Sequence, residues 1–427
     1  MPRKKDNNTS SQRRRASRPA GSQRMRRATE APKPKQIPSQ NAPAPVTVTP
    51  ANPMGAYADI LSTLAKEHRL RSIPDEAPAK SIDLLSNDYL GLAEESEKYR
   101  EEFFQRFPDA NFTSSASRLL SRSNQYHKQL EQYLESLYGR PALLLNSGYH
   151  ANVGIIQALA IPGTLFLADK LVHASIIDGL RLSGADFKRF PHNDPRKLRR
   201  LVEENEGAYH RIIVISEGIF SMDGDMAPLD ALVELRRQHP SVMLYLDEAH
   251  SFGVRGNRGL GLAEERGVIR DVDIIVGTLG KAAASAGAFV VCRDVMKQYL
   301  LNTTRSFIFS TAISPAQAAW SILMIEKIVG MNDRRRHLQR LSHHMVRELS
   351  RRLNFESPAT TQIVPLMIGD ASEAVLMSQY LARNGFDALA IRRPTVAAGS
   401  ERIRFSLNAL LTQKDIDRLI SVIGRYH

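Results

Sequence analysis

The sequence contains a single cysteine, Cys292, among its 427 residues. One cysteine excludes an intramolecular disulfide framework and a zinc site built from cysteines. The sequence also lacks any run of about 18 apolar residues, and this lack excludes a membrane-spanning helix. With 42% apolar and 24% charged residues, the chain has the composition of a globular protein that can bury a sizeable core.

The segment 1–53 lacks leucine, phenylalanine, tyrosine and tryptophan, and it contains nine prolines. Such a segment cannot bury enough apolar area to offset the entropy of ordering it, so we predict that it is disordered. It has no apolar region of the kind found in a secretory signal. Residues 1–50 hold 12 basic and 2 acidic residues, so most of the net charge of +13 belongs to this tail. We expect a solvated tail; contact with nucleic acid or another polyanion, and a transit function, are the alternatives.

The remaining residues predict an α/β protein. Apolar residues recur with helical spacing over 56–70 and 125–138, and from 315 to 349. A short strand is predicted over 81–86. Seven short apolar strands are predicted further along, at 142–145, 165–168, 187–190, 212–216, 242–246, 274–277 and 288–291. Such runs, separated mostly by helical segments, are typical of a mostly parallel sheet covered on both faces.

This pattern divides the folded chain into parts. We predict an N-terminal helix and strand segment over 54–105 and a large doubly wound domain over 106–315. A smaller C-terminal α/β domain is predicted over 316–427, with a strand at 402–407 and a final helix near 415–423.

Polar residues follow several of the predicted strands directly. The strand at 242–246 runs into Asp247, the strand at 274–277 into Thr278, and the strand at 212–216 into Glu217. The strand ending at Leu145 leads into Asn146-Ser147-Gly148-Tyr149, which begins a helix. Because ligands gather at the carboxyl ends of the strands of an open parallel sheet, these residues predict one site.

Lys281 is the most informative residue at this edge. It follows Gly280 and precedes the small residues 282–287, which leave room for a planar ligand and keep the amine in an apolar pocket. Desolvation lowers the pKa of a lysine and makes it nucleophilic. Asp247, on a neighbouring strand, suits the ring nitrogen of pyridoxal phosphate, a cofactor that uses a lysine Schiff base and an acidic partner. An exposed loop lysine and a helix-capping aspartate are the structural alternatives.

The other phosphate-binding motifs do not match. A Walker A loop would need glycine where Ile275 stands and serine or threonine where Ala282 stands. The glycines of 256–261 have neither the spacing nor the placement of a dinucleotide-binding loop.

Five motifs together resemble the α-oxoamine synthases. They are Ser86-Asn87-Asp88-Tyr89-Leu90-Gly91-Leu92, Asp169-x-x-x-His173-Ala174-Ser175, Glu217-Gly-x-Phe-Ser-Met-Asp-Gly224, Asp247-Glu-Ala-His250 and Thr278-x-Gly-Lys281. The resemblance covers roughly residues 56–425. It implies a pyridoxal-phosphate enzyme of the aspartate aminotransferase fold (fold type I), with a seven-stranded sheet in its large domain. It also implies a cytoplasmic homodimer whose active sites lie between the subunits.

The resemblance assigns three catalytic residues. Lys281 would form the Schiff base with the cofactor and remove the α-proton of the amino acid. Asp247 would keep the ring nitrogen protonated, and His173 would stack on the ring and orient the substrate. His250 and Ser221 would contact the phenolic oxygen of the cofactor.

The same resemblance assigns the phosphate and substrate contacts, and it implies no metal. Thr278 and the backbone amides of Gly148 and Tyr149 would bind the phosphate, helped by a helix N-terminus. Ser310 and Thr311 would reach the phosphate of the other subunit. Further residues would bind the substrates: Arg392 the amino-acid carboxylate, Thr395 and Asn87 the wall of the site, and Arg71 the far end of the acyl chain, with Arg69 and Arg393 as alternatives.

The C-terminal residues indicate a branch of the family. The segments 391–396 and 402–407 resemble the branch that condenses L-alanine with a pimeloyl thioester in biotin biosynthesis. The acyl carrier is coenzyme A or an acyl carrier protein. A serine- and alanine-containing loop at 113–118, in place of a glycine-rich one, leaves a second possibility open. The alternative is a relative that makes a signalling aminoketone, or one that uses glycine or serine.

Overall fold

The computed structural model describes residues 52, 54–71, 73 and 81–426. The tail predicted for 1–53 therefore lies outside the described residues, Asn52 excepted. Contacts between residues divide the chain into two units, 1–57 and 58–427, and every contact discussed below lies within the second. The domain boundaries at 105 and 315 stay predictions. Among the described residues, no helix combines the length and apolarity needed to cross a membrane.

A seven-stranded sheet, in the order β2-β8-β7-β6-β5-β3-β4, forms the centre of this second unit. Its strands are β2 (Ala142–Leu145), β3 (Thr164–Asp169), β4 (Asp186–Phe190), β5 (Arg211–Glu217), β6 (Val242–Asp247), β7 (Ile274–Thr278) and β8 (Ala288–Cys292). β8 runs antiparallel to β2 and β7, whereas β7, β6, β5, β3 and β4 run parallel. The predicted mostly parallel sheet is therefore confirmed, with every strand end within one residue of its predicted position.

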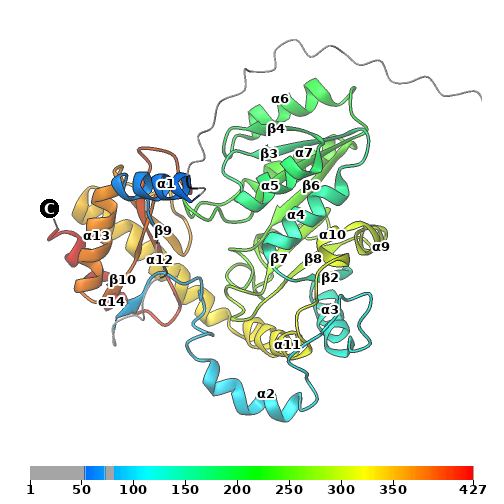
Figure 1. The fold of residues 1–427 in the computed structure, drawn as a ribbon, viewed down its shortest axis with the longest axis horizontal. Coiled ribbons are helices and arrows are strands. Elements are labelled where there is room, and N and C mark those ends of the chain that lie inside the picture. The colour runs from blue at the N-terminus through cyan, green and yellow to red at the C-terminus, as the bar shows by residue number, and fades with distance from the viewer. Residues whose placement is uncertain (1–51, 53, 72, 74–80, 427) are drawn as a thin grey trace, which may run out of the picture. The chain divides into compact units, whose positions relative to one another are not determined.

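Helices cover the sheet (Figure 1). They are α3 (Gln125–Tyr138), α4 (Gly148–Leu159), α5 (Ala174–Ser183), α6 (Pro195–Asn205), α7 (Leu229–Gln238), α8 (Leu262–Glu265), α9 (Asp294–Thr303) and α10 (Arg305–Ile308). The start of α6 shows how sequence sets these bounds: Asp194 accepts hydrogen bonds from the first free amides, and Pro195 needs none. β5 is buried over 212–217, as the uninterrupted apolar run predicts.

Two long helices lead from this sheet to a second, smaller one (Figure 1). They are α11 (Pro315–Gly330) and α12 (Asn332–Leu353). The second sheet is antiparallel, in the order β11-β12-β9. Its strands are β9 (Ile363–Met367), β11 (Leu389–Ile391) and β12 (Arg402–Ser406), with helices α13 (Ala371–Arg383) and α14 (Gln413–Ile423).

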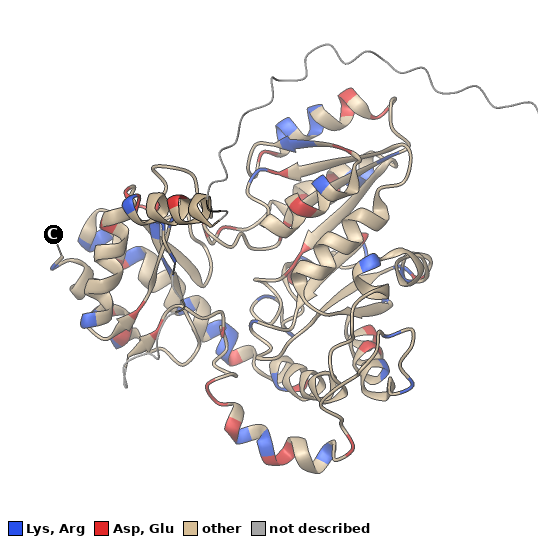
Figure 2. Cartoon of the chain, viewed as in Figure 1, with Lys and Arg blue, Asp and Glu red and all other residues tan. Residues whose placement is uncertain are grey.

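The N-terminal elements are α1 (Gly55–Lys66), β1 (Ile82–Asp83), η1 (Ser96–Tyr99) and α2 (Arg100–Arg106). β1 pairs in parallel with β10 (Phe386–Asp387). The strand predicted over 81–86 is thus only two residues long, because the amides of Leu85 and Ser86 donate to the Asp83 side chain in a turn and not to a neighbouring strand. The first helix ends at Lys66, four residues before its predicted end, because His68 adopts a φ of +52° and breaks the helical path. Figure 2 shows both signs of charge interleaved along α2, in line with a nearly neutral folded chain.

Candidate active site

A cavity of about 170 Å³ lies at the carboxyl ends of β5, β6 and β7, beside the first turn of α4. It is lined by Gly148, Tyr149, Asn152, His173, Ser175, Glu217, Asp247, Ala249, His250, Thr278 and Lys281. Seven of these residues are among those predicted for the cofactor: Gly148, Tyr149, His173, Asp247, His250, Thr278 and Lys281. The parallel strands therefore bring together residues that are far apart in the sequence, as expected at this edge.

Asp247 is a buried carboxylate at the end of β6, and it has no ion-pair partner among the described residues. Its Oδ2 accepts a hydrogen bond from Asn152 Nδ2 (2.7 Å), and its Oδ1 accepts one from the Ala249 amide (2.9 Å). Tyr245 donates to Asn152 Oδ1 (2.6 Å), which fixes the amide with its nitrogen toward Asp247. A buried anion held in this way needs a cation, which a protonated ring nitrogen would supply.

Lys281 is half-buried, and its Nζ lies 2.8 Å from His250 Nε2. Burial lowers the pKa of Lys281 to about 8, although the nearby charges of Asp247 and Glu217 oppose the effect. Burial, together with the charges of Lys281 and Arg404, also holds the pKa of His250 well below its ordinary value. The amine can therefore exist in both protonation states near neutral pH, as a group that takes and returns a proton must.

His173 lies before α5 as its N-cap, and its Nδ1 accepts a hydrogen bond from the Ser175 amide (3.2 Å). Burial lowers its pKa, so its ring is neutral with the proton on Nε2. The backbone amide of His173 donates to Glu217, which is paired in register with Asp247. Burial, and then the charge of Asp247, raise the pKa of Glu217 well above its ordinary value.

The opposite end of the cavity suits a phosphate. α4 begins at Gly148, and Ser147 accepts a hydrogen bond from the His150 amide. The amides of Gly148 and Tyr149, in the first turn, have no partner within the helix and carry its positive dipole end. The Thr278 hydroxyl lies across from Gly148, 3.8 Å from the position that a Cβ there would take.

The other predicted site residues lie outside the lining of this cavity. Ser221 is buried, and its carbonyl accepts a hydrogen bond from Arg404 Nε (2.6 Å). The Thr311 carbonyl accepts one from Asn146 (2.5 Å). Ser310 and Thr311 were predicted to act on the other subunit, so their absence from this chain's cavity leaves that prediction untested.

Two arginines form a separate cluster next to the predicted substrate residues. Arg71 Nη2 donates to Thr395 Oγ1 (3.0 Å), and Arg392 donates to the His68 carbonyl. Neither arginine makes an ion pair with a described carboxylate, and burial together with the charge of Arg71 lowers the pKa of Arg392. By contrast, the two alternatives for the acyl end are paired: Arg69 with Glu67 (2.6 Å) and Arg393 with Glu401 (3.6 Å).

Sequence reasoning missed Tyr89 and Arg404, which extend the site beyond the sheet. Tyr89 is fully buried, and its hydroxyl lies 2.6 Å from His250 Nδ1 and 2.9 Å from Asn87 Oδ1. Arg404 Nη2 donates to Asn87 Oδ1 (3.1 Å) and lies 3.5 Å from the Tyr89 hydroxyl. The available signal for Arg404 was its alternation with the apolar Ile403 and Phe405, because alternate residues of a strand share a face.

His192, for which the sequence suggested no function, supports the turn that carries Ser221. Its two ring nitrogens lie 2.9 Å from Asp169 Oδ1 and 2.8 Å from Asp225 Oδ2. Burial alone would lower its pKa, but the hydrogen bonds and charges of Asp169 and Asp225 outweigh burial and raise the pKa to about 10. A charged His192 thus ties the end of β3 to the turn that follows β5.

We expect this charge to stabilise the fold at neutral pH and not in alkali. A group whose pKa is raised in the folded state contributes fully to the free energy of unfolding at a pH below its pKa in the unfolded chain, which is about 6.5 for His192. The contribution is lost as the pH rises through the folded pKa of about 10. Urea unfolding of His192→Gln and the wild type should therefore differ most at pH 6, and the difference should shrink by about 3 kcal/mol toward pH 10. The control is Asn193→Gly, which removes an uncharged donor to Asp225 and should give a difference that does not change with pH. A constant difference for His192→Gln would contradict the assignment.

The residues at this edge define a class of protein. A half-buried lysine just after β7 and a buried aspartate at the end of β6, without an ion-pair partner among the described residues, line one cavity with a helix N-terminus. This arrangement fits pyridoxal phosphate on a fold type I scaffold. The chain matches the family of class I and II aminotransferases over residues 79–423. It is 45% identical over 388 residues to an 8-amino-7-oxononanoate synthase of Haemophilus ducreyi, covering 87% of this chain and 100% of that one.

Solved structures give the same result. A serine palmitoyltransferase of Sphingomonas wittichii has a TM-score of 0.78 and 28% identity, covering 87% of this chain and 96% of that one. An 8-amino-7-oxononanoate synthase of Francisella tularensis has a TM-score of 0.69 and 26% identity, and the match covers 82% of this chain and 98% of that one. The chain belongs to the class I and II aminotransferase family and, within it, to the α-oxoamine synthases. It is a pyridoxal-phosphate-dependent enzyme of the acyltransferase type.

Proposed function

We propose that the protein condenses L-alanine with a pimeloyl thioester to give 8-amino-7-oxononanoate, carbon dioxide and the free thiol carrier. The observation that carries the proposal is that the chain holds the cavity of Lys281 and Asp247 and, in a separate cluster, two arginines that make no ion pair among the described residues. Both substrates bear a carboxylate, and an arginine without a carboxylate partner suits each of them. The relatives named for this reaction support the choice of substrates.

Pyridoxal phosphate supplies a ring that accepts the electron pair left when the α-proton of alanine is removed. Lys281 would hold the cofactor covalently, and its amine would serve as the base that takes the α-proton of alanine. A pKa of about 8 leaves part of the Lys281 amine unprotonated near neutral pH, as this step requires. Asp247 would hold the proton of the ring nitrogen, and the hydrogen bond from Asn152 fixes the orientation of the Asp247 carboxylate.

The remaining residues bind and orient. His173 would contact the cofactor ring and His250 its phenolic oxygen, and the contact with the Tyr89 hydroxyl fixes the orientation of the His250 ring. Ser221 would contribute at the same oxygen. Gly148, Tyr149 and Thr278 would bind the phosphate.

We also propose that the active enzyme is a homodimer. Three large apolar side chains are strongly exposed: Phe112 (76%), Leu120 (79%) and Phe309 (71%). Their segments lie together, because the Ala312 amide donates to the Ala116 carbonyl (3.0 Å). A second copy that covers these residues would bring its Ser310 and Thr311 to the interface, next to a phosphate.

A test of the reaction is a substrate matrix. Alanine, glycine, serine and threonine would each be incubated with pimeloyl and with uncharged thioesters of several lengths, and the product masses measured. Alanine with pimeloyl thioester should give the highest kcat/KM. The high TM-score of a serine palmitoyltransferase favours one alternative, a relative that uses an uncharged acyl chain. A preference for uncharged chains would establish that alternative, and Lys281, Asp247 and His173 would keep their functions.

We expect Arg71 to recognise the far carboxylate of the pimeloyl group. Arg71→Ala should lower the preference for pimeloyl over heptanoyl thioester about ten- to hundredfold, because a lost charge-assisted contact costs about 1.5–3 kcal/mol. The measurement is the ratio of kcat/KM for the two thioesters. Arg69→Ala is the matched control, since Arg69 is already paired with Glu67 and should leave the ratio unchanged. An unchanged ratio in Arg71→Ala would assign the carboxylate to another residue.

A further inference from the structure

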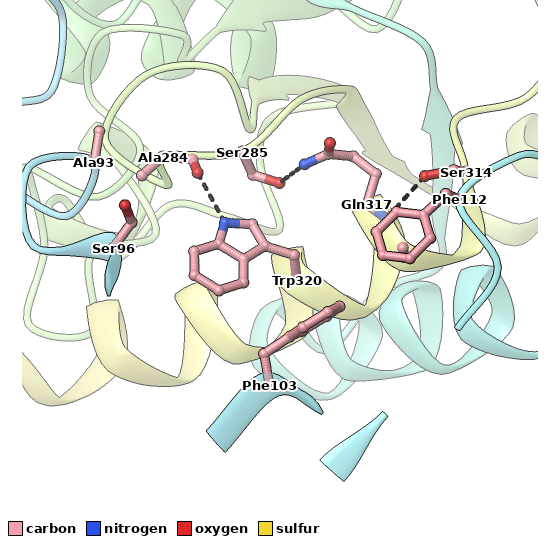
Figure 3. Close-up of a pocket in the computed structure, with 10 residues that line it drawn as sticks. Ala93, Ser96, Phe103, Phe112, Ala284, Ser285, Ser314, Gln317 and Trp320 are labelled. Atoms are coloured by element: carbon pink, nitrogen blue, oxygen red, sulfur yellow. Dashed lines mark hydrogen bonds between the residues drawn. The ribbon is translucent and has the colours of Figure 1, made fainter. Parts of the chain in front are cut away.

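A second cavity, of about 480 Å³, borders the turn that follows Lys281 (Figure 3). It is lined by Ala93, Ser96, Phe103, Phe112, Ala284, Ser285, Ser314, Ala316, Gln317 and Trp320. Trp320 is the one tryptophan of the sequence. Ala284 and Ser285 belong to the same short loop as Lys281, so this cavity and the active site share a structural element.

The turn from Lys281 to Ser285 is tight and strained. The Ala284 amide donates to the Lys281 carbonyl (2.9 Å), and the Ser285 amide donates to the Leu279 carbonyl (3.0 Å). Ala284 has a φ of +45°, in the left-handed region that favours glycine. A residue with a Cβ is disfavoured there, so contacts from outside the turn must hold it in place.

Those contacts come from one face of α11. Trp320 Nε1 donates to the Ala284 carbonyl (2.9 Å). The Ser285 hydroxyl accepts a hydrogen bond from Gln317 Nε2 (2.7 Å) and lies 2.6 Å from the Ser321 hydroxyl. Figure 3 shows the bonds of Trp320 and Gln317 reaching the loop from this helix.

The Trp320 ring is itself fixed, and this gives its hydrogen bond a defined direction. Its centroid lies 5.6 Å from that of Phe103, edge to face at 72°. The indole therefore holds the backbone at Ala284, three residues after Lys281, in a fixed position relative to α11.

We propose that Trp320 is a positioning residue for Lys281, and this rests on the proposed function of Lys281. By holding Ala284 in the left-handed conformation, the indole keeps the turn closed and directs the Lys281 amine into the cavity, toward His250. Without the indole N–H, the strain at Ala284 is relieved by opening of the turn, and water then reaches the amine.

The experiment is a double-mutant cycle on the cofactor-free protein, with Trp320→Phe, Ala284→Gly and the double variant. The readout is the pH midpoint of Lys281, from competitive labelling with acetic anhydride and mass spectrometry of its peptide. In the wild type, the pH midpoint for labelling of the Lys281 amine should lie near 8. Trp320→Phe should raise it, because a more hydrated amine is easier to protonate. In the Ala284→Gly background the same change should have little effect, since glycine adopts the left-handed conformation without strain.

Other groups also face the Lys281 amine, and the cycle holds them constant. They are Asp247 on β6, Glu217 on β5, Arg404 on β12, and His173 and His250. Pyridoxal phosphate retention is a second readout, and we expect Trp320→Phe to weaken it about tenfold. Ala284→Val is a second variant that should act like Trp320→Phe, because a β-branched residue resists the left-handed conformation.

Tyr299→Phe is the matched control. Tyr299 is also half-buried, and its hydroxyl donates to the Ala158 carbonyl (2.7 Å), so the variant loses the same kind of bond elsewhere. It should lower the unfolding midpoint and leave the Lys281 midpoint unchanged. Additive effects of Trp320→Phe and Ala284→Gly, or an unchanged Lys281 midpoint in Trp320→Phe, would overturn the proposal. A wild type that takes up no pyridoxal phosphate would refute the proposed function instead, and the labelling profile would still decide the positioning of Lys281.

Discussion

Lys281→Ala should lower turnover by several orders of magnitude, because both the covalent anchor and the base disappear with the amine. Turnover of alanine with the acyl thioester measures this loss. Borohydride treatment of the wild type, followed by peptide mass spectrometry, should locate the cofactor on Lys281. Alanine at this position should leave the fold intact, since the neighbouring residues 282–284 are alanines already.

Lys170→Ala is the control for the loss of a lysine near the same edge of the sheet. Lys170 follows β3 directly and is exposed, so its removal should leave turnover close to that of the wild type. Near-normal turnover in Lys281→Ala would contradict the assignment. So would a colourless wild-type protein that cannot be reconstituted with pyridoxal phosphate.

Asp247→Asn should retain the cofactor and lose about a hundredfold or more in removal of the α-proton. An amide cannot hold the ring nitrogen protonated. A second effect adds to this loss. Tyr245 fixes Asn152 with its amide nitrogen toward position 247, and asparagine at that position has one oxygen acceptor fewer for this nitrogen than aspartate. The measurement is exchange of the α-proton of L-alanine in D₂O without thioester, which isolates this step.

The control for Asp247→Asn is Asp273→Asn. Asp273 is also a buried carboxylate beside the sheet, but it is paired with Arg236 (3.0 Å) and does not line the cavity. This variant should lose stability and keep the wild-type exchange rate. Wild-type exchange in Asp247→Asn would mean that another group holds the ring nitrogen.

The part of the site that lies on the sheet could be predicted because its signals are local. A short apolar run ending in Asp247 or Thr278 predicts both the strand and the edge at which its last residue lies. The same five or so consecutive residues therefore predict both the β-strand and the functional residue at its end. The small residues after Lys281 indicated a pocket in the same way.

The outer part of the site could not be predicted from such signals. Arg404 meets Asn87 across a separation of 317 residues, and this contact depends on how β12 packs against the chain after β1. Asn152 lies one turn into α4, where a polar residue is ordinary, and only the hydroxyl of Tyr245 shows that it orients Asp247. The early end of α1 depends on the single backbone conformation of His68.

The pairing of β1 with β10 also sets the order in which the enzyme can be completed during synthesis. Ile82 pairs with Phe386, and the Ser406 amide donates to the Leu84 carbonyl (2.9 Å), so the segment bearing Tyr89 docks on strands made near the end of translation. Strand β6, which ends at Asp247, and β7, which precedes Lys281, emerge from the ribosome earlier. Contacts between residues so far apart in the sequence form late and slowly. Until they form, the apolar side chains of the segment that bears Tyr89 stay unburied. The site therefore depends on synthesis of the whole chain. A chain that ends before β12 retains Lys281 and Asp247 but lacks Arg404, the partner of Tyr89.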